Sequence, residues 1–132
     1  LREPQQSRPQ HGLVRAAGMF LVLYALPLLF APLAWARAFR WELPTGGGVH
    51  LTVYLGRCLG AVAVAVIALA FRAAPDPAAH RDVFHLIAAI GVLMTAIHAW
   101  GAFRRTQPWT EDVEILLYAS VAGTAAWVST TL

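Results

Sequence analysis

Four long apolar segments follow one another along the chain, separated by short polar stretches. They cover residues 13–35, 49–71, 83–103 and 113–132. Each is close to the roughly 20 residues that an α-helix needs to cross a bilayer. The apolar residues run continuously rather than alternating, which disfavours the strands of a membrane β-barrel. Because lipid offers no partners to backbone N–H and C=O groups, the pattern predicts four transmembrane helices.

The connections between the segments carry residues that end helices. Pro44 and Gly46–Gly48 lie in the first connection, Pro75 and Pro77 in the second, and Pro108 in the third. Prolines and glycines in such stretches stop helices and turn the chain. Connections this short make consecutive helices antiparallel. We therefore expect an all-α polytopic membrane protein with four antiparallel transmembrane helices.

The start of the chain differs from the rest. Residues 1–12 are mostly polar and include Pro4 and Pro9, a composition that predicts a polar N-terminal arm, either flexible or lying on a surface. Residues 13–132 then form a single four-helix transmembrane domain. No internal repeat and no second domain are evident in the sequence.

Two prolines and one threonine bear on where helices begin and end. Pro27 and Pro32 lie inside the first segment, where each removes a backbone donor and tends to kink a helix. Two interpretations stay open: a kinked helix through the whole segment, or a helix that ends near Phe30 with residues 31–41 lying along the membrane interface. Thr110 is the expected N-cap of the fourth helix, because its hydroxyl can accept from a free backbone N–H.

Composition supports the membrane interpretation. The chain is 58% hydrophobic and 13% charged, against about 25% charged residues in soluble domains. Its one cysteine, Cys58, excludes an internal disulfide. The net charge of +3 comes with arginines scattered beside the apolar segments, which is typical of residues that flank a membrane. We expect the lipid bilayer as a partner and no nucleic acid.

Small residues form stripes on the predicted helices. Gly56 and Gly60 are followed at helical spacing by Ala63, and the third and fourth helices offer Gly91 and Gly123. Small residues in such stripes let two helix backbones approach closely. Packing among the helices of this chain and packing against another subunit both stay open.

Polar residues gather at one end of the predicted bundle. The first and third connections lie on the same side of the membrane, so the ends of all four helices meet there. The polar residues at this end come from the second, third and fourth helices: His50, Tyr54 and Arg57, then His98, then Glu111 and Glu114.

Arg57 lies deepest among these residues, about seven residues or roughly 10 Å inside its helix. An unpaired charge at that depth costs several kcal/mol, so we expect Arg57 to face inward and to find a partner. Glu114 is the first candidate and Glu111 the second. The ion pair is either structural or part of a polar pocket for a headgroup, a quinone or a proton. A third option is an Arg57 that extends toward the interface without a fixed partner.

Motifs for cofactors and catalysis are otherwise scarce. His50 and His98 lie on the same predicted side, so a single haem between them is the geometric option for a haem site. No short spacing of His and carboxylates matches a zinc or di-iron motif, so we expect no metal site. Phosphate-binding glycine loops and HExxH are missing from the sequence. We therefore expect no catalytic residues and no cofactor beyond bound lipid, with haem or quinone as alternatives.

The chain resembles the small four-helix bacterial membrane proteins of DoxX-like type. The resemblance covers most of the chain, but its motifs are short: Arg57 with Gly60 (R-x-x-G), and Gln107-Pro108 followed by Glu111 and Glu114. It implies a four-helix membrane fold. Many members of that group have no assigned activity, whereas some are described as quinone-linked redox accessories, which favours association with a redox complex.

These observations predict a non-enzymatic role. The chain has almost no predicted extramembrane domain, so we expect a small integral accessory subunit that packs against and stabilises a larger membrane complex, such as a respiratory or photosynthetic one. Its location would be a bacterial inner membrane or an organelle inner membrane. The alternative is a small-molecule-binding or redox membrane protein that uses the polar cluster for a quinone, a lipid or haem.

Overall fold

The computed structural model describes residues 7–131, and all regular structure in that range is helical. Four stretches are long and apolar enough to cross a membrane: Gln10–Phe30, Gly48–Ala73, Ala78–Arg104 and Trp109–Thr131. The predicted all-α fold with four membrane-spanning helices is confirmed. By the length and composition of these helices the chain is a multi-pass membrane protein.

The chain divides into two compact units. The first unit comprises the chain up to Ala34 together with residues 44–76, and the second comprises residues 35–43 and the chain from Pro77 onward. The segment 35–43 therefore belongs to the second unit, although it precedes the second membrane span in the sequence.

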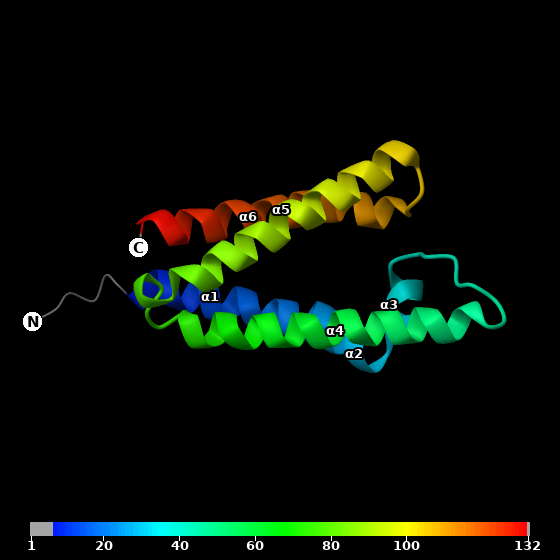
Figure 1. The fold of residues 1–132 in the computed structure, drawn as a ribbon, viewed down its shortest axis with the longest axis horizontal. Coiled ribbons are helices and arrows are strands. Elements are labelled where there is room, and N and C mark those ends of the chain that lie inside the picture. The colour runs from blue at the N-terminus through cyan, green and yellow to red at the C-terminus, as the bar shows by residue number, and fades with distance from the viewer. Residues whose placement is uncertain (1–6, 132) are drawn as a thin grey trace, which may run out of the picture. The chain divides into compact units, whose positions relative to one another are not determined.

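The first unit pairs a broken helix with a continuous one. α1 (Ser7–Phe20), the π-helical turn η2 (Leu21–Ala25) and α2 (Leu26–Phe30) follow one another along α4 (Gly48–Ala73), as Figure 1 shows. Because α1 begins at Ser7, residues 7–12 are helical and extend the first span before residue 13; residues 1–6 of the expected arm lie outside the described residues.

The break in the first span follows from its two prolines. The N–H of Leu26 bonds to the carbonyl of Leu21, a π-helical turn that directly precedes Pro27, whose missing N–H and bulky ring disturb the regular ladder. The helix then ends at Phe30, because Pro32 disfavours a helical conformation at Ala31 (φ −138°, ψ 55°). The helix end near Phe30 is observed, in place of one kinked helix through residue 35, whereas the location of residues 31–41 along the membrane interface stays a prediction. A short helix, α3 (Pro32–Ala38), follows the break.

Three of the predicted small residues make room for neighbours in this chain. A Cβ atom on Gly60 would lie 2.7 Å from the Cα of Leu29, and one on Gly56 would lie 2.6 Å from the Cβ of Pro32. In the second unit, a Cβ atom on Gly91 would lie 2.9 Å from the Cβ of Ala122. Packing within the chain is therefore the observed use of these three glycines.

Gly123 and Ala63 differ from those three glycines. A Cβ atom on Gly123 would meet no described residue within 4 Å, so this glycine is not needed for the packing of α6 within the second unit. Ala63 is half-buried on α4. The stripe on the fourth span therefore keeps an open position at Gly123.

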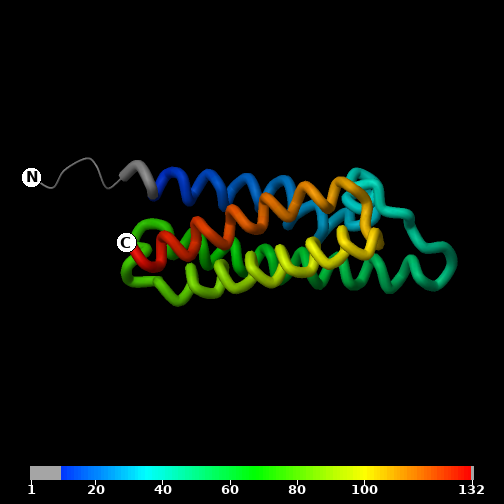
Figure 2. Tube along the Cα trace, turned by 90° about the horizontal axis from the view of Figure 1, so that it is seen from above, coloured from blue at the N-terminus to red at the C-terminus, as the bar shows by residue number. Residues whose placement is uncertain are grey.

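The second unit is built on a helical hairpin. α5 (Arg81–Arg104), entered through the 3₁₀ turn η3 (Ala78–His80), and α6 (Trp109–Thr131) run side by side in opposite directions in Figures 1 and 2. The buried positions recur mostly every three or four residues on α6, and mostly every seven residues, or two turns, on α5. They are Phe84, Gly91, His98 and Gly101 on α5, and Glu111, Glu114, Tyr118, Ala122, Ala125, Val128 and Ser129 on α6. His98, Glu111 and Glu114 all lie near the turn of the hairpin.

The turn of the hairpin is closed by Gln107. α5 ends at Arg104, and Arg105 adopts a left-handed conformation (φ 53°). The side-chain amide of Gln107 donates to the carbonyl of His98 (3.0 Å) and to Asp112 (2.8 Å). A Cβ atom on Gly101 would overlap the Gln107 side chain. Glycine at that position therefore lets the Gln107 amide cap the end of α5.

The expected N-cap of the fourth span is wrong. α6 begins at Trp109, so Thr110 already lies inside the helix. The hydroxyl of Thr110 donates to the backbone carbonyl of Phe39 (2.5 Å). Thr110 therefore ties the segment 35–43 to the start of α6 instead of capping the helix.

Candidate functional site

Three ionisable side chains meet inside the hairpin of the second unit. His98 comes from α5, and Glu111 and Glu114 come from one face of α6; they are 5%, 4% and 5% exposed. His98 Nε2 lies 3.1 Å from Glu111 Oε2 and 3.5 Å from Glu114 Oε2. One nitrogen or oxygen from each residue lies within 4.8 Å of the other two. We call these three residues the His–Glu–Glu cluster.

The backbone of α5 orients His98. Its Nδ1 lies 2.7 Å from the carbonyl oxygen of Met94. A carbonyl only accepts hydrogen bonds, so Nδ1 carries a proton and donates it to Met94. This fixes the ring with Nε2 toward the two carboxyl groups. The contact between Nε2 and Glu111 then needs one further shared proton, on the imidazole or on the carboxyl group.

Glu111 is held from a second direction by Trp41. The indole Nε1 of Trp41 donates to Glu111 Oε1 at 2.7 Å, while Glu111 Oε2 faces His98. Trp41 lies in the segment 35–43, which is fixed at the start of α6 by the Thr110 bond and by Arg40. The Arg40 guanidinium lies 5.5 Å from the centroid of the Trp109 ring, a distance at which a cation is attracted to an aromatic face.

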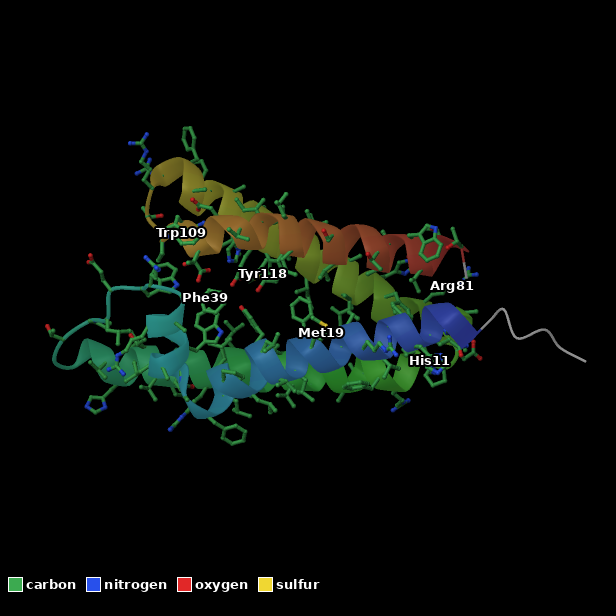
Figure 3. The ribbon with its side chains drawn as sticks, turned by 180° about the vertical axis from the view of Figure 1, so that it is seen from behind. His11, Met19, Phe39, Arg81, Trp109 and Tyr118 are labelled. Carbon is green, nitrogen blue, oxygen red and sulfur yellow. The ribbon has the colours of Figure 1, made fainter. Side chains whose placement is uncertain are left out.

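Figure 3 shows this junction, with Phe39 and Trp109 labelled near the start of α6 and Tyr118 further along the helix. The ring of Tyr118 contacts the His98 ring, with centroids 5.0 Å apart. Tyr118 follows Glu114 by one helical turn on the buried face of α6. The cluster therefore has an aromatic wall on the side away from the turn.

Glu114 differs from Glu111 in how its oxygens are satisfied. Glu114 Oε2 is buried and has no hydrogen-bond partner among the described residues; His98 Nε2 lies 3.5 Å from it. A buried polar atom without a hydrogen bond costs about 1–3 kcal/mol. Glu114 Oε2 is therefore the atom of the cluster that is free to accept a further ligand.

The structure brings together half of the predicted polar residues. His98, Glu111 and Glu114 lie together at one end of the α5–α6 pair, as the sequence predicted. His50, Tyr54 and Arg57 lie on α4 in the first unit, and all three are exposed.

The predicted pair of Arg57 with Glu114 joins residues of the two units. Within the second unit the ion-pair partner of Glu114 is His98, a residue that the sequence analysis assigned to the pocket but not to Glu114. The Arg57–Glu114 pair and the haem between His50 and His98 both span the two units, and both stay predictions.

Trp41, which holds Glu111 from outside the cluster, was not predicted from the sequence. No motif links it to Glu111, because the two are 70 residues apart. The pairing of His98 with Glu111 could have been predicted from the sequence. The two residues are 13 apart on either side of a tight turn, so antiparallel helices place them near each other. The expectation of no metal site rested on the absence of His and carboxylate residues close together in the sequence. That criterion does not find ligands that come from two different helices.

Comparisons of the chain with protein-family models, with curated proteins and with solved structures find no match. The resemblance to DoxX-like proteins therefore stays a hypothesis that rests on the short motifs around Arg57 and Gln107. The fold and the site define a class: a multi-pass, all-α membrane protein with a buried His–Glu–Glu cluster in one helical hairpin.

Proposed function

We propose that the protein is a membrane protein that binds a small ligand at the His–Glu–Glu cluster, and that this ligand is a cation or a hydrogen-bond donor. The single observation behind the proposal is Glu114 Oε2, a buried carboxylate oxygen without a hydrogen-bond donor beside two other buried ionisable groups. Ionisable residues inside membrane-spanning segments are costly and typically mark functional sites.

The charge of the cluster supports this choice of ligand. With the proton that His98 Nε2 and Glu111 share, the two carboxyl groups and the imidazole carry a net charge of −1. Burying uncompensated charge costs several kcal/mol per ion. A ligand that brings positive charge or N–H and O–H donors lowers that cost, whereas an anion raises it.

The same argument ranks the ligands expected from the sequence. A quinol brings hydroxyl donors, which suit Glu114, whereas an oxidised quinone brings mainly acceptors. A phospholipid phosphate brings negative charge. Among these ligands the reduced quinone fits the cluster best, in keeping with the redox association that the DoxX-like resemblance implies.

Thermal unfolding of the purified full chain in mild detergent tests this function. Decylubiquinol serves as the hydrogen-bond donor probe and Mn²⁺ as the cation probe. Sulfate serves as the anion for comparison. At least one of the first two should raise the unfolding midpoint of the wild type, because a ligand that binds only the folded state stabilises it. Glu114→Gln should lose the shift, and Glu42→Gln, which changes an exposed carboxylate, should keep it. If neither probe raises the midpoint, the proposed function is wrong.

A second candidate is the accessory subunit of a larger membrane complex, such as an energy-converting complex in a bacterial or organelle inner membrane. It is favoured by the open position at Gly123, beside the exposed Ala119 one turn earlier on α6. Small residues on an exposed helix face let another helix approach.

Purification in mild detergent, with identification of the chains that co-purify, tests the accessory role. Gly123→Ile should remove a specific partner, and Thr124→Ile, at an exposed position of the same helix, should retain it. Retention of the same partner by both variants, or no partner with the wild type, would contradict this role.

A further inference from the structure

We propose that the His–Glu–Glu cluster binds one divalent transition-metal ion through His98 Nε2 and a carboxylate oxygen from each of Glu111 and Glu114. This inference rests on the proposed function, since it names the class of cation that the cluster takes. It draws on four properties of the cluster: the spacing of its donor atoms, the orientation of its histidine, its charge, and its oxygen without a hydrogen bond.

The spacing of the donor atoms suits a common ion. Nitrogen and oxygen ligands that are each about 2.1 Å from a metal lie about 3.0–3.4 Å from each other at octahedral or tetrahedral angles. His98 Nε2 lies 3.1 Å from Glu111 Oε2 and 3.5 Å from Glu114 Oε2. The separation from Glu111 falls in that range and the one from Glu114 is slightly longer, so an ion can be bound with small side-chain adjustments.

The orientation of His98 is that of a metal ligand. A histidine that ligates through one ring nitrogen usually donates its other N–H to a carbonyl or carboxylate, which fixes the ring. His98 Nδ1 has this bond to the Met94 carbonyl at 2.7 Å, and Nε2 is thereby directed at the carboxyl groups. The Gln107 amide holds the carbonyl of His98 itself, which further restrains this part of α5.

The carboxyl groups, like the His98 ring, direct one atom into the cluster. Glu111 Oε1 accepts from Trp41 Nε1 at 2.7 Å, so the outer oxygen is occupied by an orienting partner while Oε2 points into the cluster. Glu114 Oε2 is buried and lacks a hydrogen-bond donor among the described residues. That atom is the independent sign of a missing ligand, because a metal ion would satisfy it.

The charge and chemistry of the donors define the ion. An ion bound at these donors displaces the proton that His98 and Glu111 share, which leaves two carboxylates and one neutral imidazole with a charge of −2. A divalent ion neutralises that charge, and neutrality is what a membrane-embedded site favours. One nitrogen with two oxygens suits Zn²⁺, Mn²⁺ or Fe²⁺. Cu⁺ prefers sulfur ligands, and Ca²⁺ takes six to eight oxygens. The protein supplies three ligands, so one or more positions stay open for water or another small ligand.

Metal binding by the purified full chain tests the proposal. The protein in mild detergent is stripped with a chelator, dialysed against Zn²⁺ or Mn²⁺, and its metal content is measured by elemental analysis; the Co²⁺ form gives an absorption spectrum that reports on the ligands. We expect one tightly bound ion per chain. Glu114→Gln and His98→Gln should weaken binding by about a hundredfold or more, and Trp41→Phe, which removes only an outer partner, by about tenfold.

Matched variants separate a loss of ligands from a loss of folding. His85→Gln and Glu42→Gln change exposed residues of the same types and should bind as the wild type does. Helix content by circular dichroism should be the same in all variants. Equal binding by wild type, Glu114→Gln and His98→Gln would overturn the metal site.

Two outcomes distinguish this inference from the function on which it rests. If the wild type binds no metal ion but is stabilised by decylubiquinol in a Glu114-dependent way, the metal site is wrong and the ligand-binding function stands. If neither metal nor quinol binds, both are wrong.

Discussion

His98 Nε2 lies 3.1 Å from Glu111 Oε2, and the two residues face each other across the turn of the α5–α6 hairpin. Both are almost fully buried, and His98 also lies within ion-pair distance of Glu114. One histidine thus lies beside two carboxyl groups in a membrane-spanning hairpin. The stability of the hairpin should depend on that balance.

Removing the histidine should therefore destabilise the protein strongly. His98→Phe keeps a flat ring but leaves Glu111 and Glu114 without their partner, and breaking a buried pair in this way costs about 3–5 kcal/mol. The measurement is the free energy of unfolding in detergent. His85→Phe, at an exposed position of the same helix, should stay within about 0.5 kcal/mol of the wild type.

Neutralising a carboxylate should partly rescue His98→Phe. The double variant His98→Phe/Glu114→Gln buries one charge fewer, so it should be more stable than His98→Phe alone. Strictly additive effects of the two substitutions in a double-mutant cycle would show that the residues do not interact.

Trp41 should contribute to stability through its indole N–H. Trp41→Phe keeps an aromatic ring but leaves Glu111 Oε1 without its donor, which should cost about 1–3 kcal/mol. Trp127→Phe changes an exposed tryptophan on α6 and provides the control. The same free energy of unfolding for both variants would contradict the observed bond between Trp41 and Glu111.

Gly60 should be intolerant of even a methyl group. A Cβ atom there would collide with backbone atoms of Leu28 and Leu29, which cannot move away as a side-chain tip can, so Gly60→Ala should cost about 1–3 kcal/mol. Gly123→Ala, where nothing lies within 4 Å of the new atom, should be within about 0.5 kcal/mol of the wild type. Thermal unfolding of the two variants side by side checks this difference.

Gln107 should stabilise the hairpin turn. Gln107→Ala removes the donor to the His98 carbonyl and to Asp112, which should cost about 1 kcal/mol. Gln10 also donates to a backbone carbonyl, that of Pro75, but in an exposed bond, so Gln10→Ala should cost less. A larger loss of unfolding free energy in Gln10→Ala than in Gln107→Ala would contradict this ranking.

The sequence by itself determined the number and the approximate limits of the membrane spans. Long continuous apolar segments have one stable solution in lipid, the helix, because every backbone polar group must be paired locally. Pro27 and Pro32 also predicted a kink or an end in the first span, because the proline ring restricts the backbone of the residues next to it. These properties are local, so a pattern along the chain is enough to find them.

Only the tertiary structure decided which polar residues meet. The depth of Arg57 along its helix pointed to Glu114, yet the ion-pair partner of Glu114 within its own unit is His98. The position of a residue along its helix gives its distance from the helix end. Contact between two side chains also requires that their helices be neighbours and that both residues lie on the facing sides of those helices. The rotation of the helices is set by the packing of small residues such as Gly91 against Ala122. Trp41 reaches Glu111 because the segment 35–43 packs on the start of α6. Such relationships depend on the neighbours of a helix in space, and the order of residues along the chain does not encode them in any short pattern.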